Sequence, residues 1–514
     1  MRRGDAVVEA GLDGEAPRER RPGLRWLLRR WNRLSRLQKT LVYGTALLGL
    51  LAALHYCVDT LPHGDNYEEI PPAKASASAA EALKADGGVK DEAGVVDEGG
   101  VKAEGGVKAE AGAAAAADRP VFTGPTTERQ RAVAAAFQHA WRGYRRLAWG
   151  RDHLRPVSGV AGDWFSLGLT LVDSMDTAYI MALTEEYEEA RRWVRDELVF
   201  TRNKDVNFFE VTIRVLGALL TNYHFTGDKM FLDKAVAAAA VSERLHALPK
   251  RRGLVPMFIS PGSGRFLPHA AVTLGARADS YYEYLLKQWL QTGRTMTYLL
   301  EDYQLAVEGM EQHLLRRSAP GGLLFAGELA AGSEAFVPKM DHLACFLPGT
   351  LALGAAHGLP ARHLALAADL LHTCYRTYAA HPTFLAPEIT HFNMEGGAGA
   401  QDMYVKSADA HNLLRPEFVE SLWYMYQLTG NTTYQDWGWQ VFQAFERHCR
   451  VENGYTSVSN VLAVPPGARD MMESFFLSET LKYLYLLFSD DRYLLDLRKY
   501  VLNSEAHALP IRDH

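Results

Sequence analysis

The sequence predicts an all-α protein whose helix hairpins close into a ring, an α/α toroid. Three observations predict this fold. From about residue 126 to the end, apolar residues recur at helical spacing, whereas strand signals are scarce apart from short stretches near 254–274 and 451–464. Aromatic-rich apolar segments recur, and most end in a glycine that supplies the left-handed turn of a helix terminus. Helices this apolar must be covered on most sides, which inner and outer layers of hairpins would achieve.

The composition fits one large domain with appendages. The chain has 514 residues and 48% of them are hydrophobic, which is enough for a large core. Its net charge of -6 provides no basic field that would indicate nucleic-acid binding. Positive charge is instead concentrated in the first forty residues.

The segment LVYGTALLGLLAALHYCV, residues 41–58, is long enough and free enough of charge to cross a bilayer. Its basic flank is N-terminal, so the positive-inside rule places residues 1–40 in the cytosol and the remainder in a lumen. We interpret 41–58 as a retained signal anchor. A cleaved signal peptide and a buried core helix are the alternatives, although the basic region is long for a signal peptide.

Residues 59–125 are predicted to form a low-complexity stem. The sequence GGVKDE and two copies of GGVKAE recur there before an alanine run. A segment with few aromatic residues and many small or charged ones cannot build a packed core. The globular part of the chain is therefore expected to span 126–514.

Two features are typical of a lumenal protein. Of the four cysteines, three lie in the globular part, and one disulfide is expected in an oxidising compartment, although the spacing does not give its pairing. Asn431 begins the glycosylation sequon Asn-Thr-Thr directly after Gly430, where an exposed turn is expected.

The repeated helices share an acidic residue near their start. The four segments are FFEVTIRVLGALLTNYHFTG with Glu210, ADSYYEYLLKQWLQTG with Asp279, RPEFVESLWYMYQLTG with Glu417, and MESFFLSETLKYLYLLFSDD with Glu473. In a ring of hairpins, the same ends of the inner helices converge, which would bring these carboxylates to one mouth. For each acid alone, favourable interaction with the helix dipole, worth about 0.3–1 kcal/mol, is an alternative explanation. Four in register, with arginines nearby, suggest a metal site, acid–base chemistry, or both.

Several long motifs in order resemble glycoside hydrolase family 47 over about residues 130–514. The motifs are LTLVDSMDTAYIMAL, FFEVTIRVLGALL, GARADSYYEYLLKQW, KMDHLACFLPGTLALG, RPEFVESLWYMYQLTG, MESFFLSETLKYLYLLFSD and NSEAHALP. The resemblance implies an (α/α)7 barrel with minor β-hairpins and Ca²⁺ at the bottom of a deep pocket. It also implies an inverting exo-α-1,2-mannosidase that trims terminal mannose from high-mannose N-glycans of glycoproteins. Such an enzyme would be a monomer held by a type II anchor in the endoplasmic reticulum or Golgi membrane, with its catalytic domain in the lumen.

Site residues are carried over motif by motif. By resemblance, Glu417 is the general base, Glu210 the general acid, and Asp279 a third acid that acts through water or shares the acid role. Further substrate-pocket residues are Arg214, Arg277, His342, Arg415, Glu420, Glu473 and Glu505. Ser504 stands where the family has a threonine that binds calcium through its hydroxyl and carbonyl oxygens, and serine keeps both. The family's disulfide corresponds to Cys345 and Cys374, which leaves Cys449 as a buried free thiol.

The chain departs from the family pattern in one place. Between 231–250 and 251–258 it is shorter by about sixty residues, the size of a helix pair with a long loop. We therefore expect one helix pair to be missing from the barrel wall. This departure keeps two alternatives open, a non-catalytic mannose-binding receptor for misfolded glycoproteins and an inactive truncated isoform. A third alternative is an α/α-barrel glycosidase for another sugar, which the acidic mouth does not exclude because the fold does not fix the function.

Overall fold

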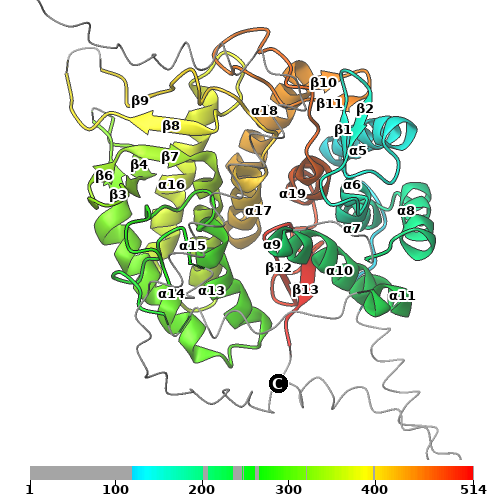
Figure 1. Cartoon of the computed structure of the whole chain (residues 1–514), viewed down its shortest axis with the longest axis horizontal. Coiled ribbons are helices and arrows are strands. Elements are labelled where there is room, and N and C mark those ends of the chain that lie inside the picture. The colour runs from blue at the N-terminus through cyan, green and yellow to red at the C-terminus, as the bar shows by residue number, and fades with distance from the viewer. Residues whose placement is uncertain are drawn as a thin grey trace, which may run out of the picture. The chain divides into compact units, whose positions relative to one another are not determined.

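The computed structural model describes residues 119–200, 207–234, 246, 248–260, 265–319, 321–397 and 400–512 (Figure 1). These residues lie within one compact unit, Lys102–His514. The predicted cytosolic tail at 1–40, the anchor at 41–58 and nearly all of the stem at 59–125 lie outside the described residues. Among the helices of the described part, none combines the length and the apolar character needed to cross a bilayer.

The described residues are mostly helical, as the sequence predicts. The α-helices are α5 (Glu128–Leu147), α6 (Leu169–Asp173), α7 (Met175–Ile180), α8 (Thr184–Asp196), α9 (Phe208–Glu210), α10 (Gly217–Thr226), α11 (Lys229–Asp233), α13 (Asp279–Gln291), α14 (Thr297–Gly309), α15 (Leu347–Ala356), α16 (Arg362–Ala379), α17 (Glu417–Thr429), α18 (Thr433–His448) and α19 (Leu481–Leu487). Single turns of π-helix form η1 (Val211–Leu216), η2 (Met310–Leu314) and η4 (Phe476–Thr480), and η3 (His342–Phe346) is a 3₁₀ turn.

The helices pack in pairs that follow one another around a ring. Within the described residues six pairs are in contact: α7–α8, α10–α11, α13–α14, α15–α16, α17–α18 and α19–α5. Successive pairs also touch, because α13 contacts α15, α15 contacts α17, α17 contacts α19, and α19 and α10 both contact α7. Between α10 and α13 lies a hairpin of β12 (Tyr500–Leu502) and β13 (Ala508–Pro510); β13 packs on α10, and β12 packs on α13 (Figure 1).

The predicted glycine stops are confirmed. Gly227 and Gly430 are the left-handed C-caps of α10 and α17, with φ of 71° and 72°. Gly293 follows α13 with φ of 62°. Residues 173–198 do not form one continuous helix, because Ala182, with φ of 54°, separates α7 from α8. A non-glycine residue in this conformation leaves no signature in the helical pattern.

Short antiparallel strands decorate the ring. The remaining strands are β1 (His153–Arg155), β2 (Val160–Gly162), β3 (Leu315–Arg317), β4 (Leu324–Ala326), β5 (Glu328–Leu329), β6 (Phe336–Val337), β7 (Lys339–Asp341), β8 (Ile389–Phe392), β9 (Met403–Tyr404), β10 (Arg450–Val451) and β11 (Gly454–Tyr455). They form two-stranded hairpins and one three-stranded sheet, β7-β8-β9. The strand signal near 451–464 corresponds to β10 and β11, whereas the described residues of 254–274 form only isolated β-bridges. Strands of two to four residues are too short for apolar alternation to reveal them.

Candidate active site

A cavity of about 530 Å³ lies where the inner helices begin. Its charged lining is rich in carboxylates. The acids are Glu210, Asp279, Glu283, Glu417, Glu420, Glu479 and Glu505, and the bases are Arg214, Arg277 and Arg415. Three of the four helix-start acids singled out in the sequence therefore line one cavity. Glu473, the fourth, does not line it, but its carboxyl interacts with the charges of Arg415 and Arg214.

Glu210 and Arg214 face each other across one turn. Glu210 ends α9 and Arg214 lies in the π-helical turn η1 that follows. Such π turns are frequent at functional sites. The Arg214 Nε donates to Glu210 Oε2 at 2.8 Å, and its Nη1 donates to Glu505 Oε2 at 2.7 Å. One buried guanidinium thus links the proposed acid to the turn that carries Ser504.

Asp279 is the first residue of α13 and is set up to hold a proton. Its Oδ1 accepts the backbone N–H of Ser280 at 2.8 Å. Burial is the main reason that the pKa of Asp279 is raised to about 7, and the charges of Glu283 and Glu417 act in the same direction. A carboxyl group with such a pKa is protonated in much of the population at neutral pH and can serve as a proton donor.

Glu417 is the first residue of α17, and its surroundings favour the ionised carboxylate rather than the protonated acid. His342 Nδ1 lies 2.9 Å from Glu417 Oε2, and Arg415 Nη1 lies 3.5 Å from Oε1. Burial on its own would raise the pKa of Glu417, but the His342 hydrogen bond and the Arg415 charge outweigh it and hold the pKa below its ordinary value. Glu417 is therefore a carboxylate at neutral pH. His342 does not line the cavity and acts on it through this contact.

Glu420, three residues along the same helix, is held by a buried lysine. Lys287 Nζ donates to Glu420 Oε1 at 3.3 Å and also pairs with Glu283. Burial raises the pKa of Glu420 to about 8; Lys287 opposes this, and Glu283 adds to it. The sequence interpretation missed Lys287 and Glu283, whose only signal was two charges four residues apart inside the aromatic-rich segment of α13.

The remaining arginines are oriented by contacts that were also missed. Arg415 Nε donates to Glu388 Oε2 at 2.6 Å, just before β8, and its guanidinium lies 5.7 Å from the ring of Phe475. Arg277 has φ of 78° and lies 5.0 Å from the ring of Phe258. Aromatic contacts of this kind fix the plane of a guanidinium.

Ser504 lies in the turn between β12 and β13 and lines the cavity. Its backbone N–H donates to the hydroxyl of Tyr284 at 3.2 Å, and its Oγ lies 3.1 Å from the same hydroxyl. Tyr284 therefore restrains the serine hydroxyl, which lacks the extra methyl group that stiffens a threonine. Glu505, the next residue, is buried and turned to Arg214.

The cavity suits a hard divalent cation. Seven acidic side chains and three arginines line it, and Ser504 adds hydroxyl and carbonyl oxygens. Calcium takes six to eight oxygen ligands, including hydroxyl, carbonyl and water oxygens. The described residues contain no group of three or more His, Cys, Asp or Glu side chains with the geometry to hold a metal. A cation here would therefore be held by the oxygens of Ser504 and by waters next to the carboxylates.

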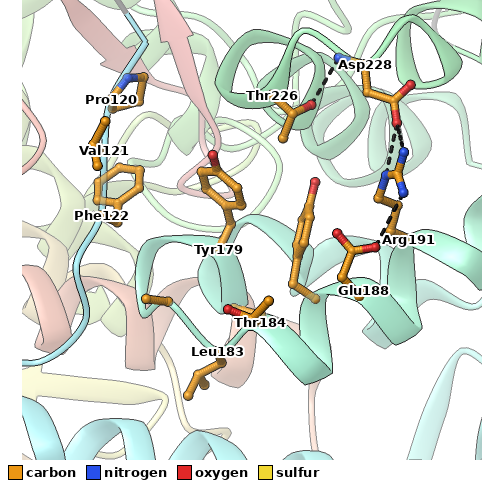
Figure 2. A pocket seen from close by; sticks show the side chains of 13 residues that line it. Pro120, Val121, Phe122, Tyr179, Leu183, Thr184, Glu188, Arg191, Thr226 and Asp228 are labelled. Atoms are coloured by element: carbon orange, nitrogen blue, oxygen red, sulfur yellow. Dashed lines mark hydrogen bonds and ion pairs between the residues drawn. The ribbon is translucent and has the colours of Figure 1, made fainter.

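A second hollow, of about 520 Å³, lies between residues 120–122 and α8 (Figure 2). Its two carboxylates share one arginine, because Arg191 pairs with Asp228 at 2.5 Å and with Glu188 at 3.3 Å. It lacks the carboxylate cluster of the first cavity. The hollow is thus not a candidate for acid–base chemistry.

The disulfide implied by the family resemblance is present. Cys345 and Cys374 are bonded across a separation of 29 residues, and Cys449 is free and buried. The bond joins η3, directly before α15, to the outer helix α16. It therefore secures the segment that carries His342.

We expect Cys345→Ser to lower the free energy of unfolding by about 3–4 kcal/mol, because opening a loop of this length returns conformational entropy to the unfolded chain. The melting temperature of the secreted globular part measures the effect. Cys449→Ala, which alters a free thiol, is the control and should shift the melting temperature less. Equal shifts in the two variants would contradict the expectation.

Asn431 lies at an exposed position between α17 and α18. Its Oδ1 accepts the backbone N–H of Thr433 at 3.0 Å. Glycosylation here stays a prediction.

The comparisons with known proteins agree with this geometry. The model of glycosyl hydrolase family 47 matches residues 136–247 and 236–511. The endoplasmic reticulum mannosyl-oligosaccharide 1,2-alpha-mannosidase of Rattus norvegicus is 49% identical over 453 residues, covering 75% of this chain and 69% of the relative. A mannosyl-oligosaccharide 1,2-alpha-mannosidase of Arabidopsis thaliana, MNS3, is 40% identical over 496 residues, covering 75% of this chain and 79% of the relative. Among solved structures, the alpha-1,2-mannosidase from Trichoderma reesei superposes with a TM-score of 0.67 at 25% identity, covering 76% of this chain and all of that one.

Proposed function

The chain belongs to glycosyl hydrolase family 47, and from this premise we propose how it carries out the family's reaction. Its function is the α-1,2-mannosidase reaction that trims high-mannose N-glycans. We propose that hydrolysis is calcium-dependent, releases terminal mannose and inverts the anomeric configuration. One observation carries the proposal: a single cavity holds a carboxyl whose pKa is raised, Asp279, and a carboxylate whose pKa is lowered, Glu417.

The roles follow from these protonation states. Glu417, held ionised by His342 and Arg415, takes a proton from the water that attacks the anomeric carbon. A carboxylic acid on the other side gives a proton to the leaving oxygen as the glycosidic bond breaks. We assign the donation of this proton to Glu210. Asp279 acts through water or shares the role of acid. Arg214, Arg277, Glu420, Glu473 and Glu505 then position the sugar.

The rate should fall as pH rises through about 7. A proton donor works only in its protonated form, which predominates below its pKa, and the pKa of Asp279 is about 7. Glu417 works only when ionised, and its lowered pKa places the acidic limb below the ordinary range of glutamate. The pH profile of kcat measures both limbs. An alkaline limb well above pH 7 would remove Asp279 from the proton-donating step.

Calcium is proposed as the bound metal. The oxygens of Ser504 would hold it, and the excess of carboxylates in the cavity supports a divalent cation at this place. When bound, calcium supplies a fixed positive charge with open positions for sugar hydroxyls and water. Tyr284 restrains the Ser504 hydroxyl through a contact of 3.1 Å.

We propose further that one helix pair is absent between α11 and α13. The alignment with the rat relative has 453 positions but uses 75% of the 514 residues, about 386, so about 67 positions have no counterpart here. The two family matches meet at 236–247, which locates the gap. Six described pairs plus an absent one account for the expected (α/α)7 barrel. In its place is an apolar groove of about 490 Å³ between η1–α10 and α13.

This groove is also consistent with the second function, a non-catalytic mannose-binding receptor. It opens beside the catalytic cavity, because Phe209, Ile213, Arg277 and Ser280 line both. A barrel that lacks this helix pair would expose apolar faces of the neighbouring helices.

A direct assay separates the two functions. Residues 119–514, secreted and purified, are incubated with a high-mannose oligosaccharide in calcium or in chelator, and the products are weighed by mass spectrometry. We expect calcium-dependent loss of single hexoses. Sugar binding without hexose loss would favour the receptor, and an aggregated protein would show that the absent helix pair is essential for folding.

We also propose a lumenal, type II membrane location for the globular part, 126–514, with the anchor at 41–58. The disulfide and the exposed sequon at Asn431 support an oxidising, glycosylating compartment. High-mannose glycoproteins of the secretory pathway are the proposed partners, and the enzyme is proposed to act as a monomer.

A further inference from the structure

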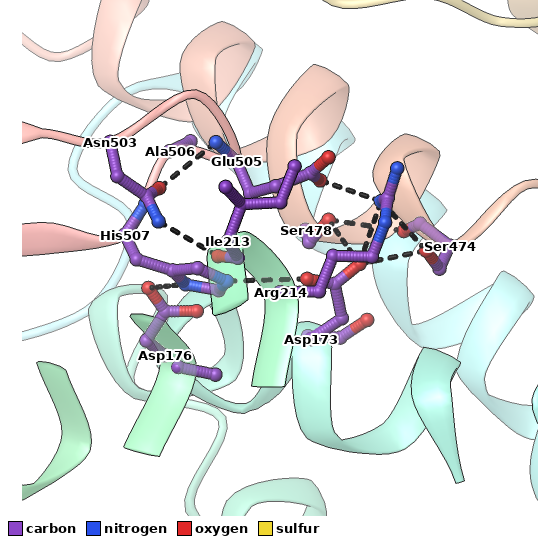
Figure 3. Close-up of polar contacts among 12 residues, drawn as sticks. Asp173, Asp176, Ile213, Arg214, Ser474, Ser478, Asn503, Glu505, Ala506 and His507 are labelled. Carbon is purple, nitrogen blue, oxygen red and sulfur yellow. Dashed lines mark hydrogen bonds and ion pairs between the residues drawn. The ribbon is translucent and has the colours of Figure 1, made fainter. Parts of the chain in front are cut away.

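Four charged side chains are completely buried next to the turn that carries Ser504 and Glu505, and Figure 3 labels Asp173, Asp176 and His507 among them. They are Asp173, Asp176, Lys482 and His507, here called the anchor cluster, and each has 0% of its side chain exposed. Burying charge is costly, and paired buried charges contribute little net stability because desolvation offsets their attraction. Stability alone therefore does not account for the cluster.

His507 lies between the two carboxylates. Its Nδ1 is 3.0 Å from Asp176 Oδ2, and its Nε2 is 3.2 Å from Asp173 Oδ1. Burial would lower the pKa of His507, but the two carboxylates outweigh it and raise the pKa above its ordinary value. Both ring nitrogens can then donate, and the imidazole tethers the end of the turn to α6 and α7.

Lys482 holds the same turn from another helix. Its Nζ donates to Asp176 Oδ2 at 2.8 Å and to the backbone carbonyl of Ala506 at 2.8 Å. Ala506 has φ of 60°, an unfavourable conformation for a residue with a Cβ. A backbone in this conformation persists only where its surroundings hold it.

The start of the turn is fixed in the same manner. The Asn503 side chain donates to the carbonyl of Ile213 at 2.7 Å, and its Oδ1 accepts the backbone N–H groups of Glu505 and His507, each at 2.9 Å. Residues 503, 506 and 507 are thus tied to the protein interior. Ser504 and Glu505, between them, are left to face the cavity.

The anchor cluster also contacts Arg214, which lines the catalytic cavity. Asp173 Oδ2 accepts from Ser474 at 2.7 Å and from Ser478 at 3.1 Å, and it lies 3.4 Å from Arg214 Nη1. Arg214 in turn binds Glu210 and Glu505. One buried carboxylate therefore connects His507 to the arginine that orients the proposed acid.

We propose that His507, acting with Asp173, Asp176 and Lys482, is a positioning residue that sets the Ser504–Glu505 turn for calcium and sugar. The inference rests on the proposed calcium-dependent function. His507 touches neither metal nor sugar; it fixes the backbone and the arginine that do. Groups that orient metal ligands typically change metal affinity by about 10–100-fold when altered.

The test compares His507→Gln with His363→Gln, a substitution of a histidine that is buried on α16 and distant from the turn in the ring of helix pairs. Glutamine keeps a donor at the position of Nε2 for Asp173 but loses the contact with Asp176 and the positive charge. Calcium affinity is measured by titration calorimetry, and melting temperature is measured with and without calcium. We expect His507→Gln to bind calcium about 10–100-fold more weakly and to lose most of the calcium-induced rise in melting temperature. His363→Gln should keep both.

A lower melting temperature with wild-type calcium affinity in His507→Gln would overturn the proposal, because the cluster would then only stabilise the fold. If that variant aggregates, Lys482→Gln takes its place, since it removes the charge and the reach to the Ala506 carbonyl. Weaker calcium binding in Lys482→Gln supports the proposal, and unchanged binding overturns it. The unaltered protein tests the calcium-dependent function itself, which is overturned if calcium neither binds nor raises the melting temperature. If the unaltered protein binds calcium and His507→Gln binds it equally well, only the role of His507 is overturned.

Discussion

Glu417→Gln is expected to lower kcat by about 100- to 10,000-fold, the usual contribution of a general base, while leaving sugar binding within a few-fold. The carboxylate of Glu417 is held ionised by His342 and Arg415, and an amide of the same shape cannot take a proton from water. Glutamine keeps an oxygen for contacts with the cavity, so the pocket keeps its form. Single-turnover hydrolysis of a high-mannose oligosaccharide measures the chemical step, and calorimetry measures binding.

Two controls make this result specific. Glu452→Gln, the same substitution at a side chain that is 87% exposed, should retain full activity. An equal melting temperature for Glu417→Gln and the unaltered protein would show that the loss is chemical. Full hydrolysis by Glu417→Gln would end its assignment as the base.

The fold was predictable where local chemistry determines it. The glycine stops of α10, α13 and α17 and the acids at the starts of α13 and α17 are visible in short segments, and the structure confirms both. The separation of α7 from α8 was not predictable, because it depends on a left-handed Ala182. Of the short hairpins, only β10–β11 was located from the apolar pattern, because a turn and four to six residues carry little periodic signal.

The site was predictable as a set of acids but not as a network. Glu210, Asp279 and Glu417 were found through their repeated place at helix starts. Lys287 was missed because its partner Glu420 is 133 residues away, and His507 was missed because Asp173 and Asp176 are more than 300 residues away. Spacing along the chain says nothing about such contacts. Only packing of the helices brings them together, and it also decides which carboxyl keeps its proton.

Ser504→Ala is expected to weaken calcium binding at least about 10-fold and to reduce hydrolysis at low calcium by a similar factor, with partial recovery at high calcium. The substitution removes the hydroxyl that Tyr284 orients and leaves the backbone carbonyl in place. Calcium affinity follows the number and arrangement of its oxygen ligands, so losing one protein oxygen of two is a large change. Calorimetric titration and the calcium dependence of the rate measure it.

Ser504→Thr is the matched control, because threonine keeps both oxygens and adds a methyl group that limits rotation of the hydroxyl. It should bind calcium as tightly as the unaltered protein or more tightly. If Ser504→Ala and Ser504→Thr bind calcium equally well, the metal does not use this hydroxyl. The anchor cluster holds the turn at residues 506 and 507, and Asn503 holds its start through Ile213. Neither substitution should therefore shift the melting temperature in chelator, and any loss of calcium affinity then belongs to the metal site rather than to the fold.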